Sequence, residues 1–193
     1  MKLFFARHGE SEGNVKLLLY GHTDCPLTDA GRQDAAALGE KLAGLDIKRC
    51  YTSPLSRAAD TARIALAGRD VPITLSDDLM EQYMGDFENT SFVEMREKYP
   101  DLIRSMLEDW TTVVPPNGES YAQLSERSNR CLDNIIEQNE DALVVAHNGT
   151  LSAIFGRLLA TEPSGIDKFW FHHGCYSCVD IEHKRIRLEY FNK

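Results

Sequence analysis

The sequence has no long hydrophobic run: its apolar stretches are far shorter than the roughly 20 residues that cross a bilayer. The segment from Met1 to Arg7 is too short and too soon charged for a secretory signal peptide. The five cysteines are odd in number and widely scattered, which argues against a disulfide framework and favours reduced thiols. We therefore expect a cytoplasmic protein with no membrane partner.

Positive charge is also scarce. The chain has 21 Lys and Arg residues against 30 Asp and Glu residues, a formal net charge of −9. Such a protein repels nucleic acids and anionic membranes, so neither is an expected partner. An anionic substrate would need a local cationic pocket to overcome the same repulsion.

Repeats, low-complexity tracts and linkers are absent, and 193 residues suit one compact domain, which we predict over residues 1–193. The short, wholly apolar runs 3–6 and 143–146 are typical of strands buried on both faces of a mainly parallel sheet. Weaker strand signals are found at residues 49–52, 176–182 and 185–191, the last two joined by a turn near His183 and Lys184.

Helix signals alternate with these strands. Thr28 is a predicted N-cap for a helix that stops at Gly44. The pair Ser53-Pro54 predicts a second helix that starts at the proline and runs to Gly68. Ser120 and Gln123 form a predicted capping box for a third. A fourth helix, ahead of Pro163, has an apolar stripe formed by Leu151, Ile154, Phe155, Leu158 and Leu159.

This alternation predicts an α/β fold: a three-layer sandwich with a mainly parallel central sheet and helices on both faces. Residues from about 80 to 118 interrupt the alternation and are rich in Glu, Met and aromatic residues. We predict that they form a small helical flap over one edge of the sheet.

Four residues suited to phosphate chemistry lie where predicted strands end. Arg7 and His8 follow the first apolar run, His147 follows the second, and Arg57 is expected at the end of the first helical turn after a third strand. Carboxyl ends of parallel strands share one edge of a sheet, so we expect these four side chains to meet there. Guanidiniums suit phosphate oxygens, and imidazoles can act as nucleophile or donor. One histidine at a strand end is more often a structural residue. Two histidines and two arginines at corresponding strand ends favour a functional site.

The sequence resembles the histidine phosphatase superfamily, also called the phosphoglycerate mutase-like family. The motifs that carry the resemblance span nearly the whole chain, in order: Arg7-His8-Gly9-Glu10-Ser11 with Asn14, Gly21, Asp24-Cys25-Pro26-Leu27-Thr28 with Gly31, Ser53-Pro54-Leu55-Ser56-Arg57-Ala58, Thr61-Ala62, Glu81, Gly85-Asp86-Phe87-Glu88, Gly118-Glu119-Ser120 and His147-Asn148-Gly149.

The resemblance implies a phosphomonoesterase that needs no metal or cofactor and acts on a small phosphorylated metabolite. In this scheme His8 attacks phosphorus and becomes phosphorylated, and Glu81 is general acid and then general base. The phosphoryl oxygens are held by Arg7, Arg57 and His147. Substrate-binding residues are expected to be Arg7, Asn14, Gly21, Arg57, Glu81 and Asn148. His8 must attack as neutral imidazole, so an acceptor on its other ring nitrogen should fix the tautomer.

Within the family the chain is most similar to the α-ribazole phosphatase branch, which acts in cobalamin nucleotide-loop assembly. Leu18 stands where many members have an arginine, which suits a monophosphate better than a bisphosphate. We expect the apolar wall for the leaving group to come from Met80, Tyr83, Met84, Phe87 and Trp110.

Several alternatives stay open: a broad-specificity or phosphoserine phosphatase, a cofactor-dependent phosphoglycerate mutase, and a non-catalytic phosphate-binding module. The oligomeric state, monomer or homodimer, also stays open. His172, His173, Cys175 and Cys178 resemble a metal cluster, but they lack a second ligand pair at zinc-site spacing, and we predict no metal site.

Overall fold

The structure of the protein, a computed structural model, describes residues 1–161, 168–183 and 185–193. A six-stranded sheet has the order β3-β2-β4-β1-β5-β6. Its strands are β1 (Lys2–Arg7), β2 (Arg49–Thr52), β3 (Ile73–Leu75), β4 (Ala142–Ala146), β5 (Tyr176–Glu182) and β6 (Arg185–Tyr190). The first four in this order are parallel, and β5 and β6 are antiparallel to their neighbours.

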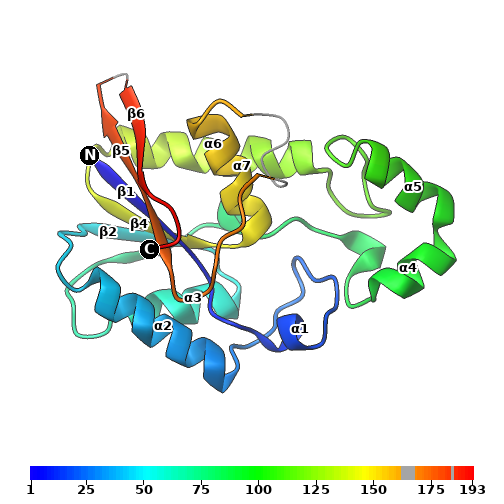
Figure 1. The fold of residues 1–193 in the computed structure, drawn as a ribbon, viewed down its shortest axis with the longest axis horizontal. Coiled ribbons are helices and arrows are strands. Elements are labelled where there is room, and N and C mark those ends of the chain that lie inside the picture. Colours follow the sequence, from blue (N-terminus) through cyan, green and yellow to red (C-terminus); the bar gives the residue numbers. More distant parts are fainter. Residues whose placement is uncertain (162–167, 184) are drawn as a thin grey trace.

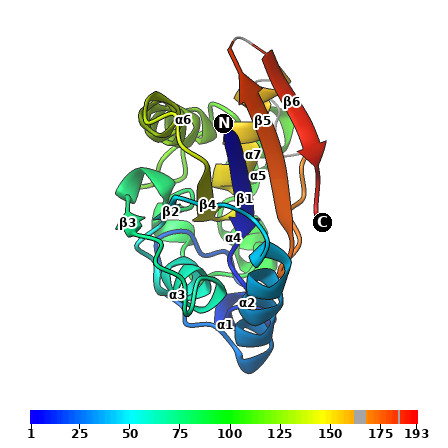
Figure 2. The same cartoon turned by 90° about the vertical axis from the view of Figure 1, so that its left-hand side faces the viewer.

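Helices cover both faces of the sheet, which confirms the predicted three-layer α/β sandwich (Figures 1 and 2). On one face lie α2 (Asp29–Leu42) and α3 (Ser56–Ala65), and on the other α6 (Tyr121–Glu137) and α7 (Asn148–Leu158). Alternate residues of β1 point to opposite faces. Phe5 therefore joins the core under α6 and α7, while Phe4 joins the core under α2 and α3.

The helix predicted after β2 starts later than expected. Pro54 is outside it: α3 begins at Ser56, so Arg57 is its second residue and not the end of its first turn. The reason is a cap supplied from far along the chain. One carboxylate oxygen of Asp24 accepts hydrogen bonds from both the backbone N–H and the hydroxyl of Ser56, each at 2.8 Å. A tertiary contact therefore overrides the local Ser-Pro signal.

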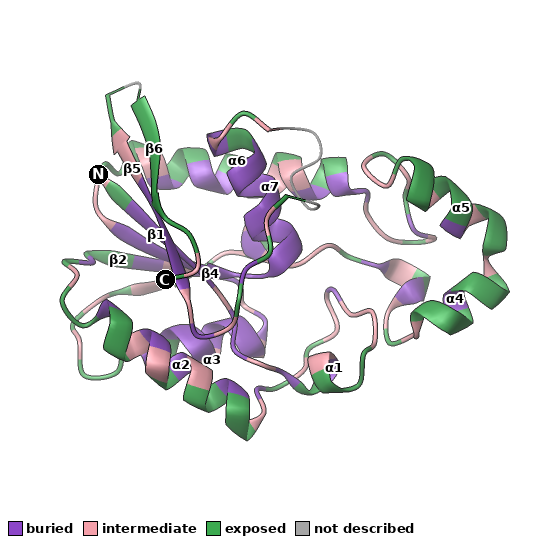
Figure 3. Cartoon of the chain, in the orientation of Figure 1, coloured by how far each residue is buried: buried purple, intermediate pink, exposed green. Residues whose placement is uncertain are grey.

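Other local predictions fared better. Thr28 caps α2, and the Ser120–Gln123 capping box is present at α6. The short strand β3 was not predicted. Helix α7 is buried on nearly all sides, so its stripe is only part of a buried surface (Figure 3). His183 has a left-handed backbone with φ of 56°, whereas Lys184 and Pro163 lie outside the described residues.

The segment from 80 to 118 extends beyond the sheet, on the right of Figure 1. It contains α4 (Phe92–Lys98) and α5 (Pro100–Glu108), and Met84, Phe87, Met95 and Ile103 form a small core there. The short 3-10 turn η2 (Gly85–Phe87) also belongs to this segment, whereas the short turns α1 (Glu12–Val15) and η1 (Asp77–Leu79) precede it in the chain. In the described part of the chain no helix is long and apolar enough to cross a bilayer.

Candidate active site

The carboxyl ends of β1 and β4 lie side by side, and a histidine follows each. The backbone N–H of His8 donates to the carbonyl oxygen of Ala146 at 3.0 Å. The imidazole rings of His8 and His147 have centroids 5.1 Å apart. Arg57, at the start of α3, donates from Nε to Nδ1 of His147 at 3.2 Å. The structure therefore brings these three residues together at the edge that the sequence indicates.

His8 is held as a neutral imidazole with a lone pair on Nε2. Its side chain is buried, and Nδ1 lies 2.7 Å from the carbonyl oxygen of Gly9. A carbonyl oxygen can only accept, so Nδ1 carries the proton, as expected for a fixed tautomer. Burial lowers the pKa of His8 well below its usual value, and the charges of Arg7 and Arg57 lower it further. An imidazole in this form is a nucleophile.

His147 has the opposite tautomer. The Nε–H of Arg57 is a donor, so Nδ1 of His147 accepts and its proton is on Nε2. That Nε2 atom is buried and has no hydrogen-bond partner among the described residues. Burial lowers the pKa of His147 well below its usual value, and Arg57 and His8 add to this shift. A buried donor without a partner is costly, so Nε2–H is available to a ligand oxygen.

Arg57 is almost completely buried and is anchored through backbone carbonyls. Its guanidinium donates to the carbonyl oxygens of Gly21 at 2.7 Å and of Thr23 at 3.0 Å. The guanidinium carbon lies 4.8 Å from the ring centroid of Tyr20. These contacts fix the direction of the fork without neutralising its charge.

Arg7 is the second guanidinium whose charge acts on His8. It donates to the carbonyl oxygen of Phe171 at 3.3 Å, and its guanidinium lies over the ring of Trp170. Its Nε is buried and has no partner within the described ranges. No carboxylate of those residues forms an ion pair with Arg7 or Arg57. The acidic protein therefore has, beside the two histidines, two guanidiniums that no carboxylate of the described residues pairs with directly.

Glu81 approaches the same place from the segment after η1. One of its carboxylate oxygens accepts from the backbone N–H of Gly149 at 3.0 Å, at the N-terminal end of α7. The hydroxyl of Thr150 lies 3.4 Å from the other oxygen. A Cβ atom on Gly149 would come within 2.4 Å of the carboxylate, so a larger residue there would push the Glu81 side chain out of this position. Both arginines, Arg7 and Arg57, are within electrostatic reach of this carboxylate.

The three predicted substrate-binding residues outside the main cluster make contacts within the protein. Asn14 accepts from the backbone N–H and the hydroxyl of Ser11, both at 3.0 Å. Gly21 offers its carbonyl oxygen to Arg57. Asn148 accepts from the backbone N–H of Phe171 at 2.9 Å, and it also borders a cavity. All three therefore support neighbouring segments of the site.

That cavity adjoins Glu81 and has a volume of about 350 Å³. Its walls are mainly apolar and consist of Leu18, Leu19, Tyr20, Glu81, Gln82, Met84, Met106, Trp110, Asn148 and Gly149. Met84 and Trp110 are in the wall as predicted, but Met80 and Tyr83 do not line this cavity, and Phe87 packs inside the core of α4 and α5. A bulky apolar group fits beside the carboxylate of Glu81.

Glu88 supports the site in a way that the sequence analysis did not recognise. Its carboxylate accepts from the backbone N–H groups of Gly21, His22, Thr23 and Met84 at 2.9 to 3.1 Å. Burial alone would raise the pKa of Glu88, but hydrogen bonds from Thr23, His22 and Met84 lower it overall. Glu88 thereby holds the loop whose carbonyls anchor Arg57. Only its place in a family motif hinted at a function.

His173 was considered only as part of a possible metal cluster. Its Nδ1 lies 2.5 Å from the carbonyl oxygen of His8, so it braces the nucleophile's backbone. Cys178 is buried in β5, and Lys41 contacts Cys175. No group of three or more His, Cys, Asp or Glu side chains arranged for a metal is found among the described residues.

The chain belongs to the histidine phosphatase superfamily (branch 1), whose sequence model matches residues 3–193. It is a phosphatase, as this family and its relatives indicate. The adenosylcobalamin/alpha-ribazole phosphatase of Salmonella typhimurium is 34% identical, covering 94% of this chain and 91% of the relative.

Two further relatives frame the comparison. A crystal structure of the alpha-ribazole phosphatase from Shigella flexneri has a TM-score of 0.95 and 31% identity, covering 100% of this chain and 96% of that one. The 2,3-bisphosphoglycerate-dependent phosphoglycerate mutase 2 of Gloeobacter violaceus is 32% identical, covering 86% of this chain and 79% of the relative.

Proposed function

We propose that this phosphatase hydrolyses phosphomonoesters through a phosphohistidine on His8. The observation that carries the proposal is the pairing of opposite tautomers: His8 presents a lone pair on Nε2, and His147 beside it presents an unpaired Nε2–H. A nucleophile and a donor for the developing phosphoryl charge are thereby set next to each other. Arg7 and Arg57 add two positive charges for the same oxygens.

The reaction has two balanced steps. In the first, His8 Nε2 forms a bond to phosphorus, the bond from phosphorus to the leaving oxygen breaks, and Glu81 donates a proton to that oxygen. In the second, Glu81 takes a proton from water, the water oxygen attacks phosphorus, and the N–P bond breaks. Inorganic phosphate leaves, and His8 and Glu81 return to their starting protonation states.

For the substrate, we propose α-ribazole 5′-phosphate or adenosylcobalamin 5′-phosphate, which places the chain in cobalamin biosynthesis. Relatives that bear these names cover nearly the whole chain. The mainly apolar cavity beside Glu81 suits a large, uncharged leaving group. Leu18 lines this cavity and supplies no second cationic subsite, which a phosphoglycerate would need for its carboxylate.

We further propose that residues 1–193 act as one domain, with residues from about 80 to 118 as its flap, and that the protein is cytoplasmic. All five cysteines are free, which supports a reducing compartment. Monomer and homodimer both remain compatible with this function.

The nucleophile is tested by trapping. Enzyme mixed with ³²P-labelled substrate and quenched in mid-reaction should carry phosphate that is labile in acid and stable in base. His8→Ala should lose both the label and the activity, whereas His172→Ala, which removes an exposed histidine, should keep both. Label on a serine or an aspartate would overturn the mechanism.

The substrate is tested by a panel of kcat/KM values. We expect α-ribazole 5′-phosphate to exceed phosphoserine, 3-phosphoglycerate and generic sugar phosphates. Equal values across the panel would indicate a broad-specificity enzyme, and a preference for phosphoserine would reassign the substrate. Interconversion of 2- and 3-phosphoglycerate would indicate a mutase.

A further inference from the structure

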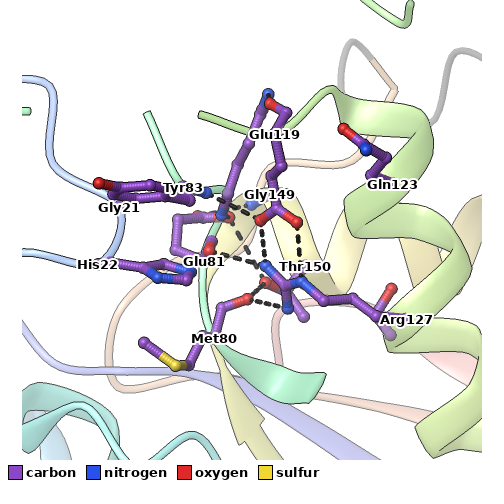
Figure 4. A network of polar contacts seen from close by, with 12 residues as sticks. Gly21, His22, Met80, Glu81, Tyr83, Glu119, Gln123, Arg127, Gly149 and Thr150 are labelled. Carbon is purple, nitrogen blue, oxygen red and sulfur yellow. Dashed lines mark hydrogen bonds and ion pairs between the residues drawn. The ribbon is translucent and has the colours of Figure 1, made fainter. Parts of the chain in front are cut away.

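Arg127, in the first half of α6, has all five of its N–H donors paired, and Figure 4 shows its side chain among Met80, Glu81 and Glu119. Nε and Nη2 donate to the two carboxylate oxygens of Glu119, at 3.0 and 2.5 Å. Nη1 donates to the carbonyl oxygens of Asp78 and Met80, at 3.0 and 2.8 Å, and Nη2 donates to that of Glu81 at 2.8 Å. A guanidinium with this many specific partners fixes the geometry of whatever it holds.

Glu119 binds the same segment of the chain. Its carboxylate accepts from the backbone N–H of Tyr83 at 2.8 Å, and its carbonyl oxygen accepts from the side-chain amide of Gln82, also at 2.8 Å. Arg127 and Glu119 therefore bind the segment 78–83 at every residue except Leu79. The side chains of both residues are less than one-fifth exposed, at 14% and 17%, so water does not readily replace these bonds.

Glu81 lies in the middle of the segment that is held. Arg127 binds its backbone carbonyl, while Gly149, at the start of α7, binds its carboxylate. Thr150 links the two, because its hydroxyl donates to the carbonyl oxygen of Met80 at 2.8 Å. The position of the Glu81 carboxylate therefore depends on two contacts. Arg127 of α6 holds the backbone of Glu81, and the N-terminal end of α7 holds its carboxylate.

We infer that Arg127, together with Glu119, is a positioning residue that sets Glu81 for proton transfer to the leaving oxygen. The inference rests on the proposed role of Glu81 as general acid. Proton transfer requires hydrogen-bond reach in the reacting complex, so a displacement of Glu81 by about 1 Å is enough to impair it. Arg127 itself points at carbonyls and Glu119, and its effect is indirect.

Two variants and one matched control test this role. Arg127→Lys keeps the charge but offers three donors from one nitrogen and cannot reach five acceptors. Glu119→Gln keeps an acceptor for Tyr83 and removes the ion pair. The control is Arg130→Lys: Arg130 lies one turn further along α6 and pairs with the carboxylate of Asp78 at 2.8 Å, with 58% of its side chain exposed.

The measurement is kcat/KM for substrates whose leaving groups differ in basicity. An alkyl phosphate needs the acid, whereas p-nitrophenyl phosphate does not. We expect Arg127→Lys to lower kcat/KM roughly 10- to 100-fold for the alkyl phosphate. For p-nitrophenyl phosphate the loss should stay within about threefold. Glu119→Gln should show the same pattern more weakly, and Arg130→Lys should behave as wild type.

Glu81→Gln in the same panel separates the two possible failures. If Glu81→Gln steepens the dependence on the leaving group and Arg127→Lys and Glu119→Gln do not, the positioning role is wrong and the proposed function stands. If Glu81→Gln has no such effect, the acid role of Glu81 is wrong, and this inference fails with it. Should Arg127→Lys prove unfolded by circular dichroism, Glu119→Gln decides the question alone.

Discussion

The buried imidazoles of His8 and His147 should lower the free energy of unfolding in mild acid, in addition to any effect of the carboxylates. Burial is the main reason why the pKa values of His8 and His147 lie well below the usual value near 6.5, and the neighbouring guanidiniums lower them further. In the unfolded chain both imidazoles return to that usual value. Folding therefore forces both to stay neutral at a pH where the unfolded chain would protonate them.

The sign and size follow from linkage. As the pH falls below 6.5, the two imidazoles bind protons in the unfolded state but stay neutral in the folded state. The free energy of unfolding therefore decreases. Each such histidine contributes about 1.4 kcal/mol per pH unit. Between pH 7.5 and 5.5, an imidazole that stays neutral in the folded protein loses about 1.4 kcal/mol, and the pair loses about 2.7 kcal/mol. The stability is fully present above 6.5 and is lost as the pH falls through this window.

Urea unfolding at the two pH values measures this loss, with a double variant as the reference. His8→Asn retains a side-chain donor for the carbonyl of Gly9, and His147→Asn retains an acceptor for Arg57 Nε, so the local hydrogen bonds can persist. All other ionisable groups are common to the two proteins, so their contributions cancel in the comparison. The buffers must be free of phosphate, because a ligand that binds only the folded state would stabilise it.

Wild type should lose more of its free energy of unfolding than the double variant between pH 7.5 and 5.5, up to the limit of about 2.7 kcal/mol that applies when both imidazoles stay neutral at pH 5.5. An equal loss in the two proteins would show that the imidazoles are not held neutral, and the tautomer argument for nucleophilic attack would fail with it.

Three further results are expected. Arg57→Met should lower kcat/KM on the order of 100-fold, because a preorganised cation at the transition state is lost, whereas Arg63→Met, which removes an exposed residue of the same helix, should have little effect. EDTA should not inhibit, since Arg7 and Arg57 supply the positive charge, and a loss of activity that zinc or magnesium restores would contradict this. Trp110→Ala should raise KM for aromatic leaving groups and leave that for small alkyl phosphates unchanged.

How much of the fold was predictable depended on whether the signal was local. The apolar runs that became β1 and β4 are buried on both faces, so their composition alone identified them. Strand β3 has only three residues, lies at an edge and is largely exposed, so its β-branched Ile73 and Thr74 form too short a run to give a periodic strand signal. The start of α3 was misplaced because its cap, Asp24, is 32 residues away.

The same distinction applies to the site. Arg7, His8, Arg57 and His147 could be placed together because parallel strands bring their carboxyl ends to one edge. Glu88 and Arg127 could not be placed from the sequence, because each binds mainly backbone groups of distant segments. Glu88 binds backbone N–H groups of Gly21 to Thr23, which are 65 to 67 residues away. Arg127 binds backbone carbonyl groups that are 46 to 49 residues away. Backbone groups have no residue identity, so no sequence pattern specifies such partners.

The positive charge for the phosphoryl group and the cavity for the leaving group come from different parts of the molecule, for a physical reason. The phosphoryl pocket lies at the sheet edge, where Arg57 is fixed by carbonyl groups and strand-end residues, so its geometry tolerates little change. The cavity for the leaving group is lined partly by Met84, Met106 and Trp110, which belong to the segment that extends beyond the sheet. Apolar walls there can be exchanged at small cost to the core. Glu81 stands at the junction, so it must be positioned by both parts, and the Arg127–Glu119 pair provides the connection that keeps its carboxylate in register with the phosphoryl pocket.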